Sequence, residues 1–321
     1  MTSQKRRENR SVSLIREDSS EFLGEGRIRR SSFERVSRNP ALKLPGWVGV
    51  TPFLLFAFLF LILPSGVLLV GAFFGRDGAL TLQNLIDLGR PRIVSAYAIT
   101  VQLSALTAFL GVVMGFLLAW SVTLGGLPQA LRGLLTTFSG VASNFGGVPL
   151  AFAFIATLGR VGLITALLKL VGIDIYDAGF SLYSFVGLAL TYLYFQLPLM
   201  VLIITPSLEG MKKEWREASV SLGGGRWTYW SRVGLPVLLP PLLAAFLLLF
   251  GNAFGAYATA YALTGGVINL VPILIGAQIR GDVLHNPGLG YALALGMVAI
   301  MAVSIVVYTW AHRRAAKWGL S

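Results

Sequence analysis

EWREASVSLGGGRWTYWSRVGLP, residues 214–236, is a polar segment between two long apolar runs. Of the 321 residues of the chain, 55% are hydrophobic and only 12% are charged, a composition typical of membrane proteins. The apolar runs contain no Lys, Arg, Asp or Glu. Each is long enough to cross a hydrocarbon core of about 30 Å, which takes roughly 20 helical residues. The segment therefore interrupts a chain that otherwise crosses a bilayer repeatedly.

These apolar runs predict six membrane-spanning helices and hence an all-α membrane protein. The predicted helices are Val48–Phe74, Ser95–Leu124, Leu134–Gly159, Leu182–Pro206, Val237–Leu263 and Gly288–Ala311. Prolines inside them, such as Pro64 and Pro198, are tolerated because neighbouring helices and hydroxyl side chains satisfy the backbone groups that a proline frees. A basic tail, residues 1–47, is expected to be mostly disordered; it precedes a transmembrane domain, residues 48–315, and a short tail, residues 316–321.

The distribution of Lys and Arg predicts the side of the membrane on which each loop lies, because basic loops are retained in the cytoplasm. Most of the 26 basic residues lie in residues 1–47, the 125–133 loop, the 207–236 loop and the C-terminal tail. In a six-helix topology these segments fall on one side. Both termini and the 207–236 loop are therefore predicted to be cytoplasmic.

Residue types exclude several classes of function. The chain has no cysteine and two histidines, so no thiol nucleophile is present and no metal site is expected. The predicted helices hold no carboxylate and no basic side chain, which argues against an enzyme embedded in the membrane; an ion-coupled transporter or channel is the other alternative. The net charge of +12 arises mainly in the cytoplasmic segments and indicates contact with anionic lipids rather than nucleic acid.

Within the polar segment, the spacing predicts two helices joined by a turn. Trp215, Ala218 and Leu222 recur at three- to four-residue intervals, which favours a helix over residues 211–222. Three consecutive glycines are expected to end this helix, because glycine readily takes the left-handed conformation at a helix C-terminus. Residues 226–232 then predict a second helix that returns the chain to the bilayer, with aromatic side chains suited to the interface.

Here the sequence resembles a known family, the inner-membrane permeases of binding-protein-dependent ABC importers. Their cytoplasmic loop carries Glu-Ala-Ala, three residues, Gly, nine residues and Ile-x-Leu-Pro. This chain has Glu217-Ala218-Ser219, Gly223 and Val233-Gly234-Leu235-Pro236 at that spacing. The departures, Ser219 for Ala and Val233 for Ile, are small changes of side chain. The similarity extends over residues 48–315.

The resemblance implies the type I ABC importer (MetI-like) permease fold and a transport subunit rather than an enzyme. In the family this loop forms the coupling helix, which docks on an ATPase subunit; the corresponding residues are Glu214, Glu217, Ala218, Ser219 and Gly223. No Gly-x-x-x-x-Gly-Lys-Ser/Thr loop occurs, so ATP and magnesium are expected on partner subunits and no cofactor on this chain. The implied partners are two ATPase subunits, a second permease subunit or another copy of this chain, and an extracytoplasmic solute-binding protein. The implied location is the bacterial inner membrane.

Polar and aromatic side chains inside apolar helices are candidates for a translocation path, and hydrogen bonding between helices is the alternative for each. The candidates are Ser143, Asn144, Phe145, Gln196, Asn252, Tyr257 and Tyr261. The stretch SNFGGVPLAFAF, residues 143–154, combines glycines with a proline and is expected to loosen the third helix near its middle. The pairs Gly111/Gly115 and Gly251/Gly255 are expected to allow close helix packing.

Two apolar segments are too short to span the membrane alone. RVGLITALLKL, residues 160–170, is amphipathic and is expected to lie flat on the outer surface, where it could meet the binding protein. GGVINLVPILIGAQI, residues 265–279, is expected to form a short surface or re-entrant helix before the sixth span.

The solute is expected to be small and polar. Similarity around EASVSLGG and YALTGGVINLVPILIG is to the spermidine/putrescine subgroup of these permeases, which implies a polyamine. Permeases for aminoethylphosphonate, iron, thiamine and sulfate share the same loop, so these solutes remain alternatives. A polycation favours carboxylates or aromatic faces, and the predicted helices offer only aromatic ones.

Overall fold

The computed structural model describes residues 47–75, 78–280 and 286–317, so all of the predicted tail, residues 1–47, except Trp47 lies outside the described residues, as do the last four residues. The chain divides into two compact units, Met1–Pro64 and Ser65–Ser321. The described part of the first unit is helical. It holds α2 (Trp47–Ala57), the π-helical turn η1 (Phe58–Ile62) and the start of α3 (Leu63–Gly71).

The second unit is also built from helices. Its elements after α3 are α4 (Gln83–Asp87), α5 (Pro91–Leu124), α6 (Gln129–Asn144), α7 (Gly147–Leu158), α8 (Leu163–Leu170), α9 (Phe185–Glu209), α10 (Lys213–Ser221), α11 (Arg226–Tyr229), the π-helical η2 (Trp230–Gly234), α12 (Leu235–Phe254), α13 (Ala258–Thr264), α14 (Val271–Arg280) and α15 (Pro287–Lys317). An isolated bridge joins Phe74 and Leu80, and the described residues contain no β-sheet.

Six helical stretches among the described residues are long and apolar enough to cross a membrane, which confirms the predicted number. They are Gly49–Gly71, Pro91–Leu124, Gly147–Leu170, Phe185–Glu209, Arg226–Phe254 and Pro287–Arg313. All but the third overlap a predicted helix over most of its length. The chain is therefore an all-α, multi-pass membrane protein.

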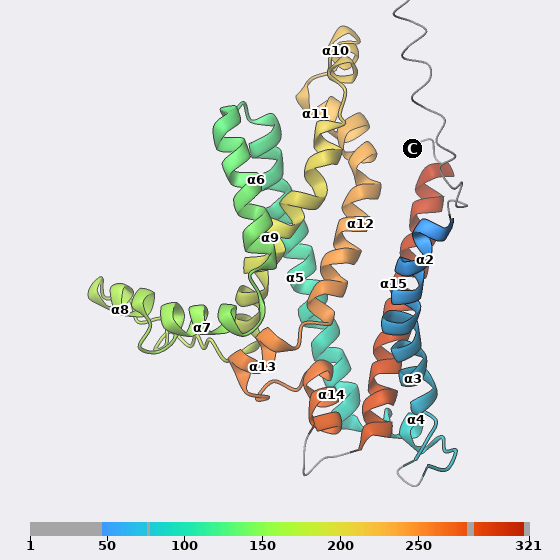
Figure 1. Cartoon of the computed structure of the whole chain (residues 1–321). Helices are drawn as coiled ribbons and strands as arrows, with labels where there is room; N and C mark the ends of the chain where they lie inside the picture. Colours follow the sequence, from blue (N-terminus) through green and yellow to red (C-terminus); the bar gives the residue numbers. More distant parts are fainter. Residues whose placement is uncertain (1–46, 76–77, 281–285, 318–321) are drawn as a thin grey trace, which may run out of the picture. The chain divides into compact units, whose positions relative to one another are not determined.

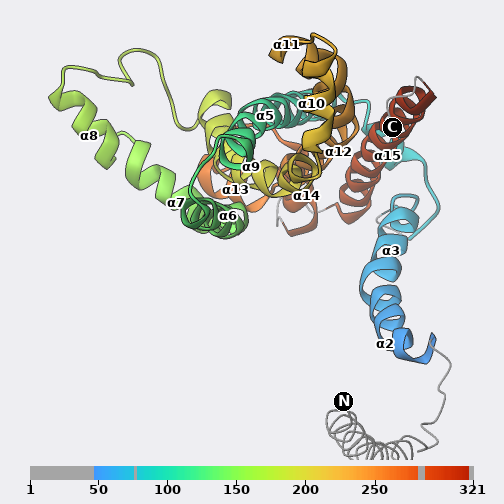
Figure 2. The ribbon, with the colours of Figure 1, turned by 90° about the horizontal axis from the view of Figure 1, so that it is seen from above.

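The predicted third helix, Leu134–Gly159, is wrong as a single helix. α6 ends at Asn144 and α7 begins at Gly147, which has φ +71°. α6 packs along α9, whereas α7 and α8 run across the direction of the bundle helices (Figures 1 and 2). Hydropathy alone therefore selects residues 147–170 as a span, although α6 is the helix that runs beside the bundle.

The predicted fifth helix, Val237–Leu263, is also interrupted. α12 ends at Phe254, and after Gly255 and Ala256 the chain turns into the short helix α13. α13 packs beside α7. Apolar composition runs through both interruptions, so the hydropathy pattern shows neither of them.

The core lies where α5, α9 and α12 pack side by side. Two glycines on α5 allow this close approach: a Cβ on Gly111 would lie 2.8 Å from Leu249 Cδ2, and one on Gly115 would lie 2.6 Å from Met200 Cβ. The predicted packing role of the Gly111/Gly115 pair is confirmed. Leu249 and Met200 are themselves fully buried.

Hydrogen bonds of polar side chains join the helices at the end of the second unit that holds α4 and α14. The Val271 amide donates to Thr100 Oγ1 on α5 (3.0 Å), and the Tyr97 hydroxyl donates to the Leu293 carbonyl on α15 (2.6 Å). The first residues of α14 are buried against α5 and α15. The expected short helix within residues 265–279 is therefore present and packed.

α8 coincides with the amphipathic run predicted at residues 160–170. It leaves large apolar side chains exposed, including Leu170 at 85%. Lys169 pairs with Asp174 (3.0 Å), whose Oδ1 also accepts from the Tyr176 amide (2.9 Å). The Lys169 hydrogen bond, followed by backbone bonds from Tyr176 and Asp177, lowers the pKa of the Asp174 carboxyl. These contacts order the turn that follows α8.

Candidate functional site

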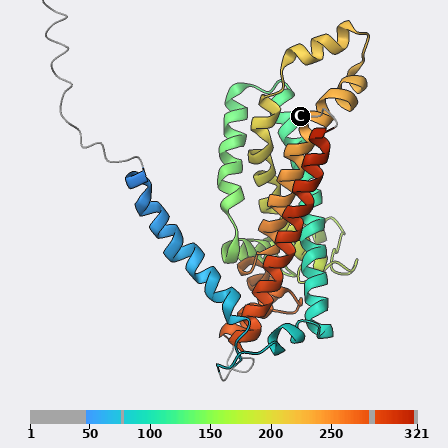
Figure 3. The same cartoon turned by 90° about the vertical axis from the view of Figure 1, so that its right-hand side faces the viewer.

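The polar segment forms a hairpin of helices at the opposite end of the unit from α14, with α10 leaving α9 and α11 returning to α12 (Figure 3). Gly223 follows α10 with φ +77°. Its amide donates to the Val220 carbonyl (2.9 Å), and the Gly224 amide donates to the Ser219 carbonyl (2.8 Å). This pair of bonds is a Schellman motif, which satisfies the last helical carbonyls and reverses the chain. The predicted helix-turn-helix is confirmed.

The three glycines of the turn differ in backbone conformation and in the space available for a side chain. A Cβ on Gly223 meets no atom within 4 Å, but its positive φ strains any side chain. A Cβ on Gly224 would lie 2.8 Å from the Ser219 carbonyl oxygen. Gly225 is extended, with φ −77°, and a Cβ there meets open space. Only the first two are therefore needed for the turn.

The tip of the hairpin is exposed. Glu214, Glu217 and Ala218 are exposed and Ser219 is half-buried. Large apolar side chains stand out beside them, with Leu222 89% and Trp227 83% exposed. These two exposed apolar side chains beside charged ones make this end of the hairpin a candidate protein contact. We call Glu214, Glu217, Ala218, Ser219, Leu222 and Trp227 the hairpin tip.

The base of the hairpin is fixed to the bundle. Trp230 packs edge-on against Trp120 of α5, with ring centroids 6.1 Å apart. A Cβ on Gly234 would lie 2.7 Å from the Trp230 ring, so this glycine makes room for the ring one turn earlier in η2. Met211 and Trp230 both pack on the cluster that contains the core of α9 and α12. The base of the hairpin is therefore packed against bundle helices.

The candidate path residues on α6 gather at its C-terminal end. The Ser143 hydroxyl and the Asn144 amide both donate to the Gly140 carbonyl, at 3.1 and 2.9 Å. Both bonds lie within α6. Phe145, the first residue after the helix, is 41% exposed. The expected loosening of the third helix is thus a complete break at Phe145 and Gly146.

Aromatic side chains surround this break. Tyr194 of α9 stands edge-on to Phe145 and to Phe154 of α7, at 6.2 and 6.0 Å between ring centroids. In and beside α13, which packs against α7, the rings of Tyr257 and Tyr261 are stacked with their centroids 5.5 Å apart. Sequence reasoning missed Tyr194, because a half-exposed tyrosine in an apolar helix has no distinctive pattern.

Two hydrogen bonds connect the breaks to their neighbours. The Gly147 amide, at the start of α7, donates to Thr259 Oγ1 of α13 (2.8 Å). The Tyr192 hydroxyl of α9 donates to the Ala256 carbonyl, between α12 and α13 (2.9 Å). Thr259 and Tyr192 are buried. Sequence reasoning missed both residues, although the flanking Gly255 and Gly265 were a usable signal of an interrupted helix.

The two remaining path candidates lie apart from this cluster. Gln196 is fully buried, and its Nε2 donates to Thr107 Oγ1 of α5 (2.8 Å). Gln196 Oε1 has no hydrogen-bond partner. In this structure Gln196 joins two helices and does not face open space. Asn252 is exposed on α12.

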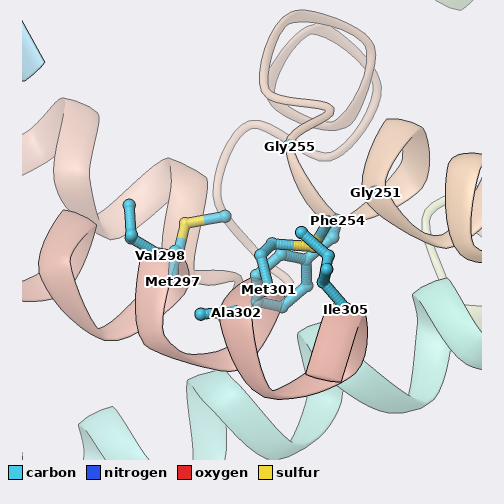
Figure 4. A pocket seen from close by; sticks show the side chains of 8 residues that line it. All are labelled: Gly251, Phe254, Gly255, Met297, Val298, Met301, Ala302 and Ile305. Carbon is cyan, nitrogen blue, oxygen red and sulfur yellow. The ribbon is translucent and has the colours of Figure 1, made fainter. Parts of the chain in front are cut away.

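A groove of about 330 Å³ lies between α12 and α15 (Figure 4). Its lining residues are Gly251, Phe254, Gly255, Met297, Val298, Met301, Ala302 and Ile305. Every lining side chain is apolar, and none of the candidate path residues is among them. Its chemistry suits packing against another helix or lipid rather than a polar solute.

The family described as "Binding-protein-dependent transport system inner membrane component" matches residues 111–317, from the middle of α5 through α15. This chain belongs to that family. It is a permease component of an ABC importer, with the hairpin inside the matched region. The family is one of transport subunits.

Relatives of this permease transport different solutes. The chain is 26% identical over 255 residues to a probable sulfate transport system permease of Helicosporidium sp. subsp. Simulium jonesii, covering 79% of this chain and 89% of that protein. It is 29% identical over 206 residues to the molybdenum permease ModB of Mycobacterium tuberculosis, covering 63% and 72%. It is 23% identical over 275 residues to the spermidine/putrescine permease PotB of Haemophilus influenzae, covering 82% and 93%.

Among solved structures, the permease is similar to a chain of a bacterial alginate ABC transporter in complex with an alginate pentasaccharide-bound periplasmic protein. The TM-score is 0.66 at 15% identity, and the match covers 84% of this chain and 93% of that chain. The likeness supports the fold of an ABC importer permease, as predicted.

Proposed function

We propose that α10 is the coupling helix of this permease and docks on a cytoplasmic ATPase subunit through the hairpin tip. The observation that supports this role is the exposed tip on a fixed base: Leu222 and Trp227 are exposed, while Trp230 is packed on α5. Both ends of the hairpin continue into bundle helices. A displacement of the tip by the ATPase would therefore move α9 and α12 as rigid elements.

The remaining partners follow from this role. Two ATPase subunits bind ATP and magnesium, a second permease subunit completes the membrane part, and a solute-binding protein delivers cargo on the other side. Both termini of this permease are placed in the cytoplasm with the hairpin, on the distribution of Lys and Arg. This chain itself carries no cofactor in the proposal.

Cross-linking tests the docking role. The chain has no native cysteine, so single-cysteine variants report one position each. In the assembled importer, Leu222→Cys should cross-link to the ATPase subunit. The matched control is Val161→Cys, which is 98% exposed near α8 and should give no such product. Absence of a cross-link from Leu222→Cys, or an equal one from the control, would reject the docking surface.

The proposed path runs past the two helix breaks and includes Ser143, Asn144, Phe145, Tyr257 and Tyr261, with Asn252 further along α12; Gln196, which is buried between α5 and α9, is left out of it. Exposed polar and aromatic groups at the breaks support this assignment. The only carboxylate within the six spans, Glu209, is paired with Arg132. A path with so little charge suits a permease whose binding protein provides selectivity, because a tight site would slow release.

For the cargo we propose a small polar solute, with a polyamine as the first candidate. The relative PotB covers most of this chain, and aromatic faces at the breaks suit an organic cation. The second candidate is an oxyanion, which the sulfate and molybdenum relatives favour. Aminoethylphosphonate, iron and thiamine remain further outcomes of the test.

A thermal-shift screen of the cognate binding protein separates these candidates. Spermidine, putrescine, sulfate, molybdate, aminoethylphosphonate, thiamine and an iron chelate are each added at about 100 times the expected dissociation constant, which stabilises a bound protein by about 2.7 kcal/mol. A shift with a polyamine alone supports the first candidate. A shift with sulfate or molybdate and with no amine discards it and leaves the importer role intact.

A further inference from the structure

The two helix interruptions of this permease meet in space. Gly147 begins α7 and Thr259 lies in the first turn of α13, yet they are joined by a hydrogen bond of 2.8 Å across 112 residues of sequence. The backbones are also close, since a Cβ on Gly147 would lie 3.8 Å from Ala258 Cβ. The first amides of a helix have no partner within the helix, so Thr259 supplies one that α7 lacks.

A second bond attaches this pair to the bundle. The Tyr192 hydroxyl donates to the Ala256 carbonyl, which lies in the interruption and has no helical partner of its own. Apolar contacts join the same three helices, because Leu150 of α7, Leu263 of α13 and Tyr192 of α9 belong to one buried cluster. α7, α13 and the adjoining half of α9 are thus one packed body.

The segments that lead into this body each contain a glycine with space around it. Gly146 separates α6 from α7, and a Cβ there meets no atom within 4 Å. Gly255 separates α12 from α13, and a Cβ there meets only the Gly251 carbonyl, at 3.6 Å. Both junctions therefore have little crowding around their glycines, whereas α9 is joined to this body by the Tyr192 hydrogen bond.

From this arrangement we infer that Thr259 is a positioning residue for transport, because its hydroxyl holds α7 to α13 so that both follow α9. The inference rests on the proposed function, in which α9 leads from the membrane to α10. When the ATPase displaces the hairpin tip, the Phe145 and Tyr257 sides of the path then move together. Tyr192 acts in the same way through Ala256.

The activity test compares variants that keep or remove the Thr259 hydroxyl. Thr259→Val keeps the shape but leaves the part-buried Gly147 amide without this acceptor, and Thr259→Ser keeps the acceptor. In the assembled importer, we measure ATP hydrolysis stimulated by binding protein loaded with spermidine and, separately, with sulfate. Thr259→Val should lower the stimulated Vmax by about tenfold, with KM for the loaded binding protein unchanged. Thr259→Ser should retain wild-type values.

The matched control is Thr264→Val in the same helix. Thr264 is equally buried, but its hydroxyl donates to the Ala260 carbonyl within α13. Its loss should leave Vmax within about twofold of wild type, because that bond is local. Equal losses in Thr264→Val and Thr259→Val would overturn the inference, since both would then report only the stability of α13.

A distance measurement tests the packed body without relying on transport. Spin labels on Phe152→Cys of α7 and Val267→Cys, just after α13, both stand at exposed positions. One narrow distance population should persist with and without ATP, and Thr259→Val should broaden it. A narrow population in Thr259→Val, with wild-type Vmax, would overturn the inference. If no loaded binding protein stimulates the wild-type importer, the proposed function fails while this distance still decides whether α7 and α13 move together.

Discussion

Arg132, in the first turn of α6, forms an ion pair with Glu209, the last residue of α9. The pair joins two neighbouring helices at the end of the bundle where α10 begins. Both side chains are partly exposed, so the attraction is weakened by solvent. The main effect of the ion pair is to hold Glu209 beside α6, at the point directly before the hairpin.

The ion pair predicts a recoverable loss of stability. Arg132→Glu should lower the thermal midpoint of the purified permease complex, because like charges then face each other. Adding Glu209→Arg should restore most of it, with a coupling free energy of about 0.2–1 kcal/mol. Additive effects of the two substitutions in a double-mutant cycle would show that the pair does not form in the membrane.

The turn after α10 predicts that Gly223 and Gly225 respond differently to the same change. Gly223→Val places a β-branched residue at φ +77°, which costs about 1–3 kcal/mol, and should uncouple ATP hydrolysis from the loaded binding protein. Gly223→Asn should retain coupling because asparagine tolerates this conformation. Gly225→Val is the control, since its backbone is extended. Normal coupling in Gly223→Val would contradict the role of the turn.

Topology is testable with two exposed positions. Leu222→Cys should resist an impermeant thiol reagent added to intact cells and react after the membrane is opened. Val161→Cys should react from outside without opening. The expectation follows from the Lys and Arg distribution, which puts the hairpin in the cytoplasm. Labelling of Leu222→Cys in intact cells would show that the hairpin lies outside the cytoplasm and would contradict the predicted orientation.

The contacts of Asp174 predict a pH-dependent turn after α8. Its pKa is lowered in the folded protein, so its stabilising contribution is complete above the ordinary carboxyl pKa of about 3.9 and is lost as the pH falls through the lower folded value. Asp174→Asn should lose this stabilising contribution at neutral pH, because asparagine carries no charge. We expect faster hydrogen exchange at the Tyr176 amide at pH 7 in Asp174→Asn and unchanged exchange in Asp177→Asn. Equal exchange in wild type and Asp174→Asn would contradict this.

The buried hydrogen bond between Thr107 and Gln196 predicts that replacing Thr107 lowers the free energy of unfolding more than replacing Gln196 does. Thr107→Val leaves the buried amide of Gln196 without a bond and should cost about 1–3 kcal/mol. Gln196→Met removes an oxygen that already lacks a partner, and Thr107 keeps its bond to the Leu103 carbonyl, so the cost should be below about 1 kcal/mol. Thermal midpoints of the two variants in detergent decide the order, and the reverse order would contradict the pairing.

The sequence by itself determined the number of apolar spans and the hairpin between α9 and α12. Both depend on local properties: the length of a hydrophobic run, the three- to four-residue spacing around Ala218, and the freedom of Gly223 to take positive φ. The family pattern in the same segment also identified the kind of transporter before any contact was known.

Only the tertiary structure decided where the third and fifth helices end and what holds their ends. Apolar composition continues through Gly146 and Gly255, so hydrophobic periodicity carries no signal of the turns there. The glycines and proline of residues 143–154 predicted a loosened third helix, but not that the chain turns. The partner of the Gly147 amide is Thr259, 112 residues away, and the partner of Gln196 is Thr107 on another helix. A polar side chain in an apolar helix looks the same in sequence whether it faces a path or a neighbour, because the difference lies in which helix packs against it.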